Sequence, residues 1–262
     1  MEEIKVNYTQ RQLAEEVFHD ERAHLCENEP FKIEAFCAKT CPENLFVLEQ
    51  IGQLQDKIIL DLGCGGGEAA IYFAWKGAEV DAIDISLNAL SILKKRKFFY
   101  NLENKIHTIK APTEHLPVVS EKYDIVFGNG ILHHVNIEST IKEVFRVLKK
   151  GGTAVFIEPL TYNPIIKIYR MICRELRSEH ETPLKYSDIK FMKTLFGNEL
   201  HQEYHFFTLL IFIYFFIIGI DPNKVRYWKK IIYDEDKYKG IFNFLYKIDR
   251  SFFFLFSFLK KF

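Results

Sequence analysis

A glycine-rich segment between two acidic residues is the part of the sequence whose residue types best suit ligand binding. Asp61 precedes the run Gly63-Cys64-Gly65-Gly66-Gly67, and Asp84 follows that run by about 20 residues. Glycine adopts left-handed backbone conformations and lets a ligand approach the main chain closely. The Asp84 carboxylate can accept hydrogen bonds from two ribose hydroxyls, and the neighbouring Ile85 can cover the face of a base. These residues predict a site for a nucleoside-containing cofactor.

The spacing of the glycines bears on the type of cofactor. The dinucleotide-binding pattern G-x-G-x-x-G/A fails from the first glycine of the run, but Gly65, Gly67 and Ala70 meet its weaker form. Asp61 would repel a pyrophosphate, whereas it could hold an ammonium group. The sequence has no G-x-x-x-x-G-K-[ST] segment, which excludes a P-loop. An NAD(P)-dependent oxidoreductase is kept as an alternative.

The elements that must position these residues alternate between strand and helix. Strands are expected at 57–62, 79–84, 105–110, 123–128 and 153–157. Helices are expected at 43–53, 68–76, 87–100 and 137–150. This alternation predicts right-handed βαβ units and a doubly wound, parallel α/β sheet, whose ligands bind beyond the carboxyl ends of the strands.

The alternation of expected strands and helices ends after Pro159. We expect helices at 163–177 and 187–196, two antiparallel edge strands from 198–207 and the apolar run up to residue 220, and mostly helix over 222–262. No clear linker divides the chain. We therefore expect one domain with three parts. They are an N-terminal helical cap (1–56), a cofactor-binding core (57–160), and a substrate-side insertion with edge strands and C-terminal helices (161–262).

Composition restricts the class of protein. The 262 residues include 35 basic and 35 acidic side chains, so zero net charge argues against a partner whose phosphates must be neutralised. The polar N-terminus has no apolar segment typical of a signal peptide, and the five cysteines form no CxxC pair. These features predict a reduced, cytoplasmic protein with no metal site. The longest apolar run, 206–220, is shorter than the ~20 residues that span a bilayer as a helix.

Five segments in this order resemble class I S-adenosylmethionine-dependent methyltransferases, specifically their small-molecule branch. They are IILDLGCGGGEAA (58–70), VDAIDIS (80–86), APTEHLP (111–117), YDIVFGNGILHHV (123–135) and LKKGGTAVFIEP (148–159). The resemblance covers about residues 45–160. It implies S-adenosyl-L-methionine as the cofactor and a Rossmann-like, mostly parallel sheet of seven strands.

The same resemblance implies roles for individual residues. Asp61 and the loop of Gly63, Cys64, Gly65 and Gly67 would face the methionine part of the cofactor. The ribose hydroxyls would bind Asp84, adenine would pack on Ile85, Thr113 and Glu114 would lie at the adenine edge, and Asn129 and Gly130 would lie under the aminocarboxylate and sulfonium. Family members often have an acidic residue just before the Thr113 position, where this sequence has Pro112.

Methyl transfer needs few catalytic groups, because the sulfonium already carries the activated methyl. The protein must align the acceptor in line with the breaking bond, and a general base is needed only if the acceptor loses a proton. The candidate catalytic residues are His133, His134 and Glu158, which follow two of the expected strands. Candidate substrate-binding residues in the following segment are Tyr162, Arg170 and His180, although Arg170 could instead pair with a nearby glutamate.

The expected acceptor is a small, hydrophobic or aromatic molecule. Residues 129–132, Asn-Gly-Ile-Leu, lack the prolines and the stacking aromatic of loops that methylate nucleic-acid amino groups, so no nucleic-acid partner is expected. The alternatives are an RNA- or protein-directed methyltransferase and a non-catalytic scaffold subunit. More than half of the 25 Phe residues follow residue 195. This Phe-rich region could pack in a core or homodimer, line a lid, or contact a membrane.

Overall fold

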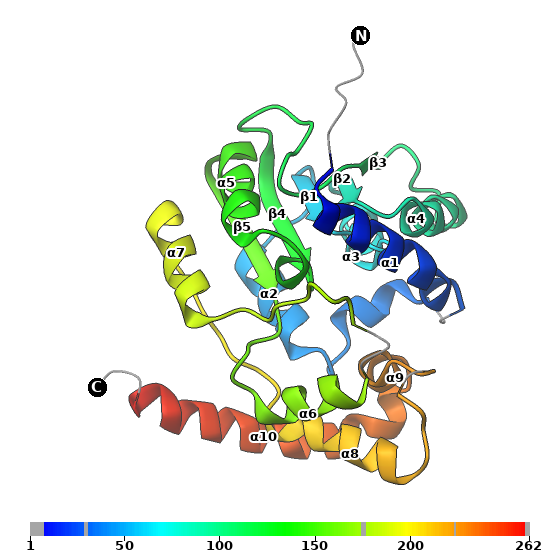
Figure 1. The fold of residues 1–262 in the computed structure, drawn as a ribbon, viewed down its shortest axis with the longest axis vertical. Coiled ribbons are helices and arrows are strands. Elements are labelled where there is room, and N and C mark those ends of the chain that lie inside the picture. The colour runs from blue at the N-terminus through cyan, green and yellow to red at the C-terminus, as the bar shows by residue number, and fades with distance from the viewer. Residues whose placement is uncertain (1–7, 29–30, 174–176, 223, 260–262) are drawn as a thin grey trace.

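A single parallel sheet organises the first two thirds of the chain (Figure 1). The structure, a computed structural model, describes residues 8–28, 31–173, 177–222 and 224–259. The strands are β1 (Ile58–Leu62), β2 (Glu79–Asp84), β3 (Ile106–Lys110), β4 (Tyr123–Asn129) and β5 (Leu148–Ile157). They lie in the order β3-β2-β1-β4-β5 and all pair in parallel. The α/β sheet expected from the sequence is therefore confirmed.

Helices cover both faces of the sheet, because alternate residues of each strand point to opposite sides. Ile59 and Phe127 pack against α2 (Pro42–Ile51), α3 (Glu68–Trp75), α4 (Leu87–Phe99) and the 3-10 turn η1 (Ile33–Cys37). Leu60 and Val126 face the other side, which is covered by α5 (Ile137–Val147). Ser86 begins α4 as expected, since its hydroxyl accepts a hydrogen bond from the Ala89 N–H at 3.0 Å.

The helix α1 (Gln10–Asn28) lies across α4 (Figure 1). The Asp20 carboxylate joins the two helices, because it accepts hydrogen bonds from Ser86 Oγ at 2.5 Å and Asn88 N at 3.0 Å. The described residues before β1 thus form helices and turns, which agrees with the helical content expected for the N-terminal cap.

The segments after β5 form a second, smaller core. The helices are α6 (Pro164–Ile172), α7 (Tyr186–Phe196), α8 (Leu210–Ile217), α9 (Tyr227–Tyr233) and α10 (Glu235–Leu259). Phe212 and Phe215 of α8 pack against Tyr227 of α9 and Phe242 of α10, while α6, α8 and α10 lie together (Figure 1). Three of the Phe residues after residue 195, Phe212, Phe215 and Phe242, are therefore buried in this core.

Two expectations about strands are wrong. Among the described residues the sheet has five strands rather than seven, and the run 206–220 forms the 3-10 turn η4 (Phe207–Leu209) and α8 instead of edge strand. The helix is favoured because it places Ile211, Phe212 and Phe215 on one buried side, so tertiary packing overrides β-propensity. In addition, β5 begins at Leu148 rather than at residue 153, directly after α5.

None of the helices formed by the described residues combines the length and the apolar character needed to cross a bilayer.

Candidate functional site

A cavity of about 590 Å³ lies at the carboxyl ends of β1, β2 and β4. It brings together ten of the eleven residues that sequence analysis proposed for cofactor binding. These are Asp61, Gly63, Cys64, Gly65, Asp84, Ile85, Thr113, Glu114, Asn129 and Gly130. Gly67 does not line the cavity. It begins α3 in a left-handed conformation (φ +80°), and a Cβ there would lie 2.2 Å from Leu93 Cδ1, so it lets α3 pack against α4.

The loop after β1 leaves room for a ligand at Gly65. Its φ is +50°, and a Cβ built there would meet nothing within 4 Å. The Gly65 N–H donates a hydrogen bond to Asp84 Oδ2 at 2.8 Å, and the Ser86 N–H donates to Asp84 Oδ1 at 2.8 Å. Asp84 therefore fixes the glycine loop to the end of β2. Burial raises the pKa of this carboxyl, although these backbone hydrogen bonds oppose the change.

Asp61 is a second buried carboxylate in the cavity, with 2% of its surface exposed. Its Oδ2 accepts a hydrogen bond from the Ala70 N–H at 3.0 Å, at the start of α3. Burial raises the pKa of Asp61 to about 7, the Ala70 hydrogen bond lowers it, and the charges of Asp84 and Glu68 raise it further. Among the residues that the structure describes, neither Asp61 nor Asp84 forms an ion pair. The cavity is thus suited to a cationic ligand with hydroxyl groups.

The residues proposed for the adenine edge line the cavity, but their polar atoms have protein partners. Thr113 is buried, and its Oγ1 lies 3.0 Å from Thr140 Oγ1. Glu114 accepts hydrogen bonds from Gln12 Nε2 at 3.0 Å and from the Asn136 N–H at 3.1 Å. Glu114 consequently connects α1 to the beginning of α5.

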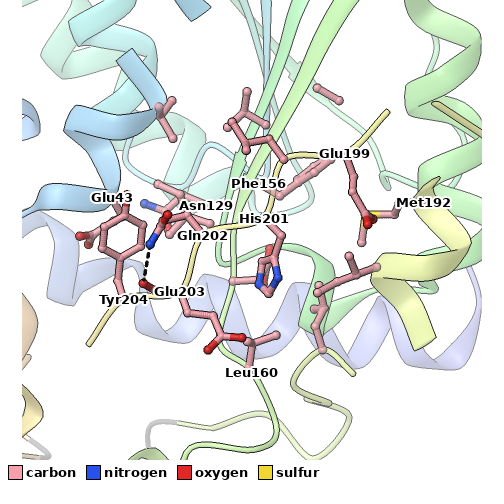
Figure 2. Close-up of a pocket in the computed structure, with 18 of the residues that line it drawn as sticks. Glu43, Asn129, Phe156, Leu160, Met192, Glu199, His201, Gln202, Glu203 and Tyr204 are labelled. Carbon is pink, nitrogen blue, oxygen red and sulfur yellow. Dashed lines mark hydrogen bonds between the residues drawn. The ribbon is translucent and has the colours of Figure 1, made fainter. Parts of the chain in front are cut away.

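A larger cavity of about 1800 Å³ adjoins the first one. Asn129, Gly130 and Ile157 line both cavities, so they meet where β4 and β5 end. Figure 2 shows Asn129 and Glu43 on one side of the larger cavity, with Leu160 and Met192 on other sides. Much of the lining is apolar or aromatic, including Phe156, Ile166, Tyr186, Met192, Tyr204, Leu209, Phe212, Trp228, Phe252 and Phe253.

Two of the proposed catalytic residues are bonded to each other beside the junction of the cavities. His133 Nδ1 lies 2.6 Å from Glu158 Oε2, and His133 Nε2 lies 3.3 Å from Glu181 Oε1. Burial lowers the pKa of His133, but hydrogen bonds to the two carboxylates raise it to about 9. The remaining oxygen of Glu158 accepts the N–H groups of Ile131 and Leu132 at 2.8 and 2.7 Å. Both side chains therefore hold the loop after β4, and Glu158 also lines the larger cavity.

The third candidate, His134, lies on the cofactor side. Its Nδ1 is 3.1 Å from Glu15 Oε2, and Glu15 Oε1 accepts a hydrogen bond from Ser178 Oγ at 2.6 Å. Burial lowers the pKa of His134, whereas the hydrogen bond to Glu15 raises it. Burial also acts to raise the pKa of Glu15, but hydrogen bonds from His134, His19 and Ser178 hold it well below its usual range.

The proposed substrate-binding residues are not gathered at one place. Tyr162 lines the larger cavity and stacks on Tyr186, with ring centroids 4.9 Å apart. Arg170 also lines it, but its Nη1 donates a hydrogen bond to Glu181 at 2.5 Å, within the buried group around His133. His180 is exposed and lines neither cavity.

Sequence analysis missed several residues that the fold brings to the cavities. Glu43 lines both, and its Oε2 lies 2.8 Å from His205 Nε2, which ties the segment before α8 to α2. Glu15 and His19 of α1 line the smaller cavity. Their spacing of four residues on a helix places them on one face, and that was the only local signal.

Comparison with known proteins agrees with this geometry. Residues 60–156 match the family model described as a methyltransferase domain. The ubiquinone biosynthesis O-methyltransferase of Nitrosomonas europaea is 35% identical over 134 residues, which are 50% of this chain and 55% of that protein. The sarcosine/dimethylglycine N-methyltransferase of Aphanothece halophytica is 36% identical over 104 residues, 39% of this chain and 38% of that protein. The chain spans about half the length, or less, of these two curated relatives.

A solved structure shares the fold over a longer part of the chain. The magnesium protoporphyrin IX methyltransferase of Synechocystis, with S-adenosylhomocysteine bound, is 16% identical with a TM-score of 0.55, and the match covers 75% of this chain and 95% of that one.

The parallel sheet, the glycine loop and the two buried carboxylates define a Rossmann-like α/β domain with a cavity that suits a nucleoside. The family match identifies residues 60–156 further, as a methyltransferase domain, and the comparisons support the class I, S-adenosylmethionine-dependent type. The cofactor that the comparisons support is S-adenosyl-L-methionine. Its ammonium, sulfonium and ribose hydroxyls suit a cavity with two buried carboxylates that form no ion pair among the described residues.

Proposed function

We propose that the protein transfers a methyl group from S-adenosyl-L-methionine to a small, apolar or aromatic acceptor bound in the larger cavity. The observation that carries this proposal is the junction of the two cavities at Asn129 and Gly130. A donor in the smaller cavity and an acceptor in the larger one would face each other there. Methyl transfer needs such an in-line approach and the exclusion of water.

In the donor cavity, each proposed contact follows from chemistry. Asp61 would hold the ammonium group, and Asp84 would accept hydrogen bonds from the ribose hydroxyls while it keeps Gly65 in place. Ile85 would cover the adenine ring. Thr113 and Glu114 would border the adenine, with their polar atoms already engaged by Thr140, Gln12 and Asn136.

The bound cofactor supplies an activated methyl group on a sulfonium, so the protein chiefly has to align the reactants. We assign His133 and Glu158 to positioning rather than to proton removal. Together they fix the Ile131 and Leu132 N–H groups and so the loop that begins at Gly130. His134 faces α1 and the donor cavity rather than the acceptor.

The lining of the larger cavity favours an apolar acceptor. Tyr162 and Tyr186 form a stacked pair at its wall, and Phe252 of α10 contributes to the same lining. Its volume exceeds the usual 300–1,000 Å³ of ligand pockets, so a large molecule can be accommodated. The similarity to an O-methyltransferase of ubiquinone biosynthesis supports a small-molecule acceptor. Arg170 could bind an acceptor only if its hydrogen bond to Glu181 were broken. His180 is exposed and lies outside the cavity lining, so it could bind only a part of the acceptor that extends out of the cavity.

The Phe-rich region after residue 195 contributes side chains both to the wall of the larger cavity and to the second core. Phe212 belongs both to the second core and to the cavity lining. The exposed apolar side chains of this region, among them Phe216, Ile217 and Phe244, are the surface through which a homodimer or a membrane would be contacted. Sedimentation of the protein with and without lipid vesicles separates these two contacts.

The test is a methyl-transfer screen with isotope-labelled S-adenosylmethionine. The full chain is incubated with metabolite extract, bulk RNA or bulk protein in parallel, and labelled products are identified by mass. Label in an apolar small molecule is the expected result. Label in RNA or protein alone would assign the chain to a macromolecule-directed class, and label in no fraction would favour a scaffold subunit.

A calorimetric control separates cofactor binding from turnover. S-adenosylhomocysteine should bind, whereas NAD should not. Binding of NAD without any response to S-adenosylhomocysteine would overturn the proposed donor site.

A further inference from the structure

Three potential metal-ligating side chains meet at the edge of the donor cavity. Glu15 and His19 lie one turn apart on α1, and His134 follows β4 in the 3-10 turn η2 (Leu132–His134). Glu15 Oε2 is 3.4 Å from His19 Nε2 and 3.1 Å from His134 Nδ1. All three ligand atoms lie within 4.8 Å of one another. None of the contacts proposed for the methyl donor uses these atoms.

These separations match those between the ligands of a tetrahedral ion. Zinc binds imidazole nitrogen and carboxylate oxygen at about 2.0–2.2 Å, which places neighbouring ligand atoms about 3.4 Å apart. Two of the three separations are already close to this value. A small rotation of the His19 ring, whose side chain is 35% exposed, would adjust the third one.

The surroundings hold the ligands in this arrangement. Ser178 Oγ donates to Glu15 Oε1 at 2.6 Å, which leaves Glu15 Oε2 directed at the two imidazoles. The His19 and His134 rings meet edge to face, with centroids 4.8 Å apart. A ligating carboxylate whose second oxygen is hydrogen-bonded is a usual feature of protein metal sites.

The donor set also selects the type of metal. Two imidazole nitrogens and one carboxylate oxygen suit zinc and neighbouring transition ions, whereas magnesium and calcium prefer sites made only of oxygen. Three protein ligands leave a fourth position for water.

We propose that Glu15, His19 and His134 form a zinc-type site that clamps α1 across the donor cavity. The clamp would connect two elements that the sequence separates by more than a hundred residues, α1 and η2. Further polar contacts between α1 and the core are Gln12–Glu114, Glu16–Lys110, Asp20–Ser86 and Glu27–Lys95. Because α1 lines the cavity, metal binding and retention of the methyl donor should favour each other.

The experiment begins with the 262-residue chain after treatment with a chelator. Titration with Zn²⁺ is followed by calorimetry, and titration with Co²⁺ is followed by the visible absorption of the tetrahedral ion. We expect one equivalent per chain. His19→Ala should weaken binding by more than about 100-fold, the upper end of what loss of a second-shell partner costs. The matched control is His24→Ala, an exposed histidine on the same helix, which should bind as the parent protein does.

Three further measurements make the outcome decisive. Glu15→Gln removes a ligand but retains an acceptor for Ser178, so weak metal binding by a variant with an unchanged circular-dichroism spectrum supports the site. Zn²⁺ should also tighten S-adenosylhomocysteine binding in the parent protein and not in His19→Ala. The metal site would be overturned if the parent protein bound no Zn²⁺, or if His19→Ala bound Zn²⁺ equally well.

The clamp would be overturned if Zn²⁺ bound without changing the affinity for S-adenosylhomocysteine. Asp84→Asn should still take up the ion, so failure of the proposed donor site is distinguished from failure of the metal site.

Discussion

The Gly65 N–H donates a hydrogen bond to Asp84 Oδ2 at 2.8 Å, so the residue that ends β2 holds the loop that follows β1. This contact joins the two parts of the donor site that sequence analysis identified separately. It gives Asp84 two tasks, since the same carboxylate fixes the loop and is the proposed partner of the ribose hydroxyls.

Asp84→Ala tests both tasks together. A hydrogen bond to a charged group contributes about 2 kcal/mol, so the affinity for S-adenosylhomocysteine should fall at least about 30-fold. Asp84→Asn retains an oxygen for the Gly65 N–H and should lose less. Calorimetry measures the dissociation constants. Asp56→Asn is the control, because the exposed Asp56 lies before β1, at the opposite end of that strand from the loop, and lines neither cavity. Unchanged binding by Asp84→Ala would refute the ribose assignment.

The raised pKa of Asp61 predicts that donor binding depends on pH. Burial raises this pKa from 3.8 to about 7. Near pH 7, Asp61 is therefore protonated and uncharged in a fraction of the protein molecules without bound ligand. An ammonium group favours the charged form, and affinity for S-adenosylhomocysteine should therefore increase as the pH rises from about 6 to 8, with release of a proton. Calorimetry in buffers of different ionisation enthalpy measures that proton. Asp61→Asn should bind weakly at every pH, and an equally steep pH dependence in this variant would exclude Asp61 as its source.

Asp61 also has a consequence for the stability of the free protein. Its pKa is higher in the folded state than in the unfolded chain, so the folded protein binds more protons between about pH 4 and 7. The contribution of this group to the free energy of unfolding is thus present below pH 4 and is lost as the pH rises through about 7. Denaturant unfolding at pH 5 and pH 8 should show the loss in the parent protein and less of it in Asp61→Asn.

The meeting of Asp61, Gly65 and Asp84 at one cavity could be predicted because these residues belong to short segments. Asp61, Gly65 and Asp84 stand at the carboxyl ends of β1 and β2, and adjacent parallel strands place such positions together whatever the rest of the chain does. Hydrophobic patterning identifies the strands, and the glycines identify the loop. Contacts between these residues follow from the pairing of β1 with β2, so no knowledge of more distant segments is needed to predict them.

The environment of the catalytic candidates could not be predicted in the same way. His133 lies between Glu158 and Glu181, which come from two different segments. His134 meets Glu15 of α1, more than a hundred residues earlier. The sequence cannot show whether the ring nitrogens of a histidine after a strand are free or hydrogen-bonded. The carboxylates that bind these nitrogens come from distant segments and meet them only in the folded chain.

Glu158→Ala should cost stability rather than proton transfer. It would leave the buried Ile131 and Leu132 N–H groups and His133 without their partner, a loss of about 2–4 kcal/mol that lowers the melting temperature by about 5–10 °C. Glu158→Gln retains an oxygen for both N–H groups and should keep measurable methyl transfer to the acceptor found in the screen. Complete loss of turnover in a Glu158→Gln variant with parental stability would instead make Glu158 a general base.

The helix that replaces the expected edge strand is capped by a residue that comes more than forty positions later in the chain. Buried Asp249 of α10 accepts hydrogen bonds from the N–H groups of Phe206, Phe207 and Thr208, and from Thr208 Oγ1 at 2.8 Å. These are the donors that a helix leaves unpaired at its beginning. A carboxylate at this place favours helix over strand for 207–217, and the local sequence gives no sign of it.

Asp249→Ala tests this long-range cap. Loss of a capping side chain costs about 1–2 kcal/mol, and the buried position leaves three N–H donors without an acceptor, so we expect at least about 2 kcal/mol and a melting temperature lower by about 4–8 °C. Asp249→Asn should retain part of the stability, since its amide oxygen can still accept. Asp236→Ala is the matched control, because Asp236 lies on the same helix with its side chain 98% exposed. Equal melting temperatures for Asp249→Ala and Asp236→Ala would show that the fold of α8 does not depend on the cap.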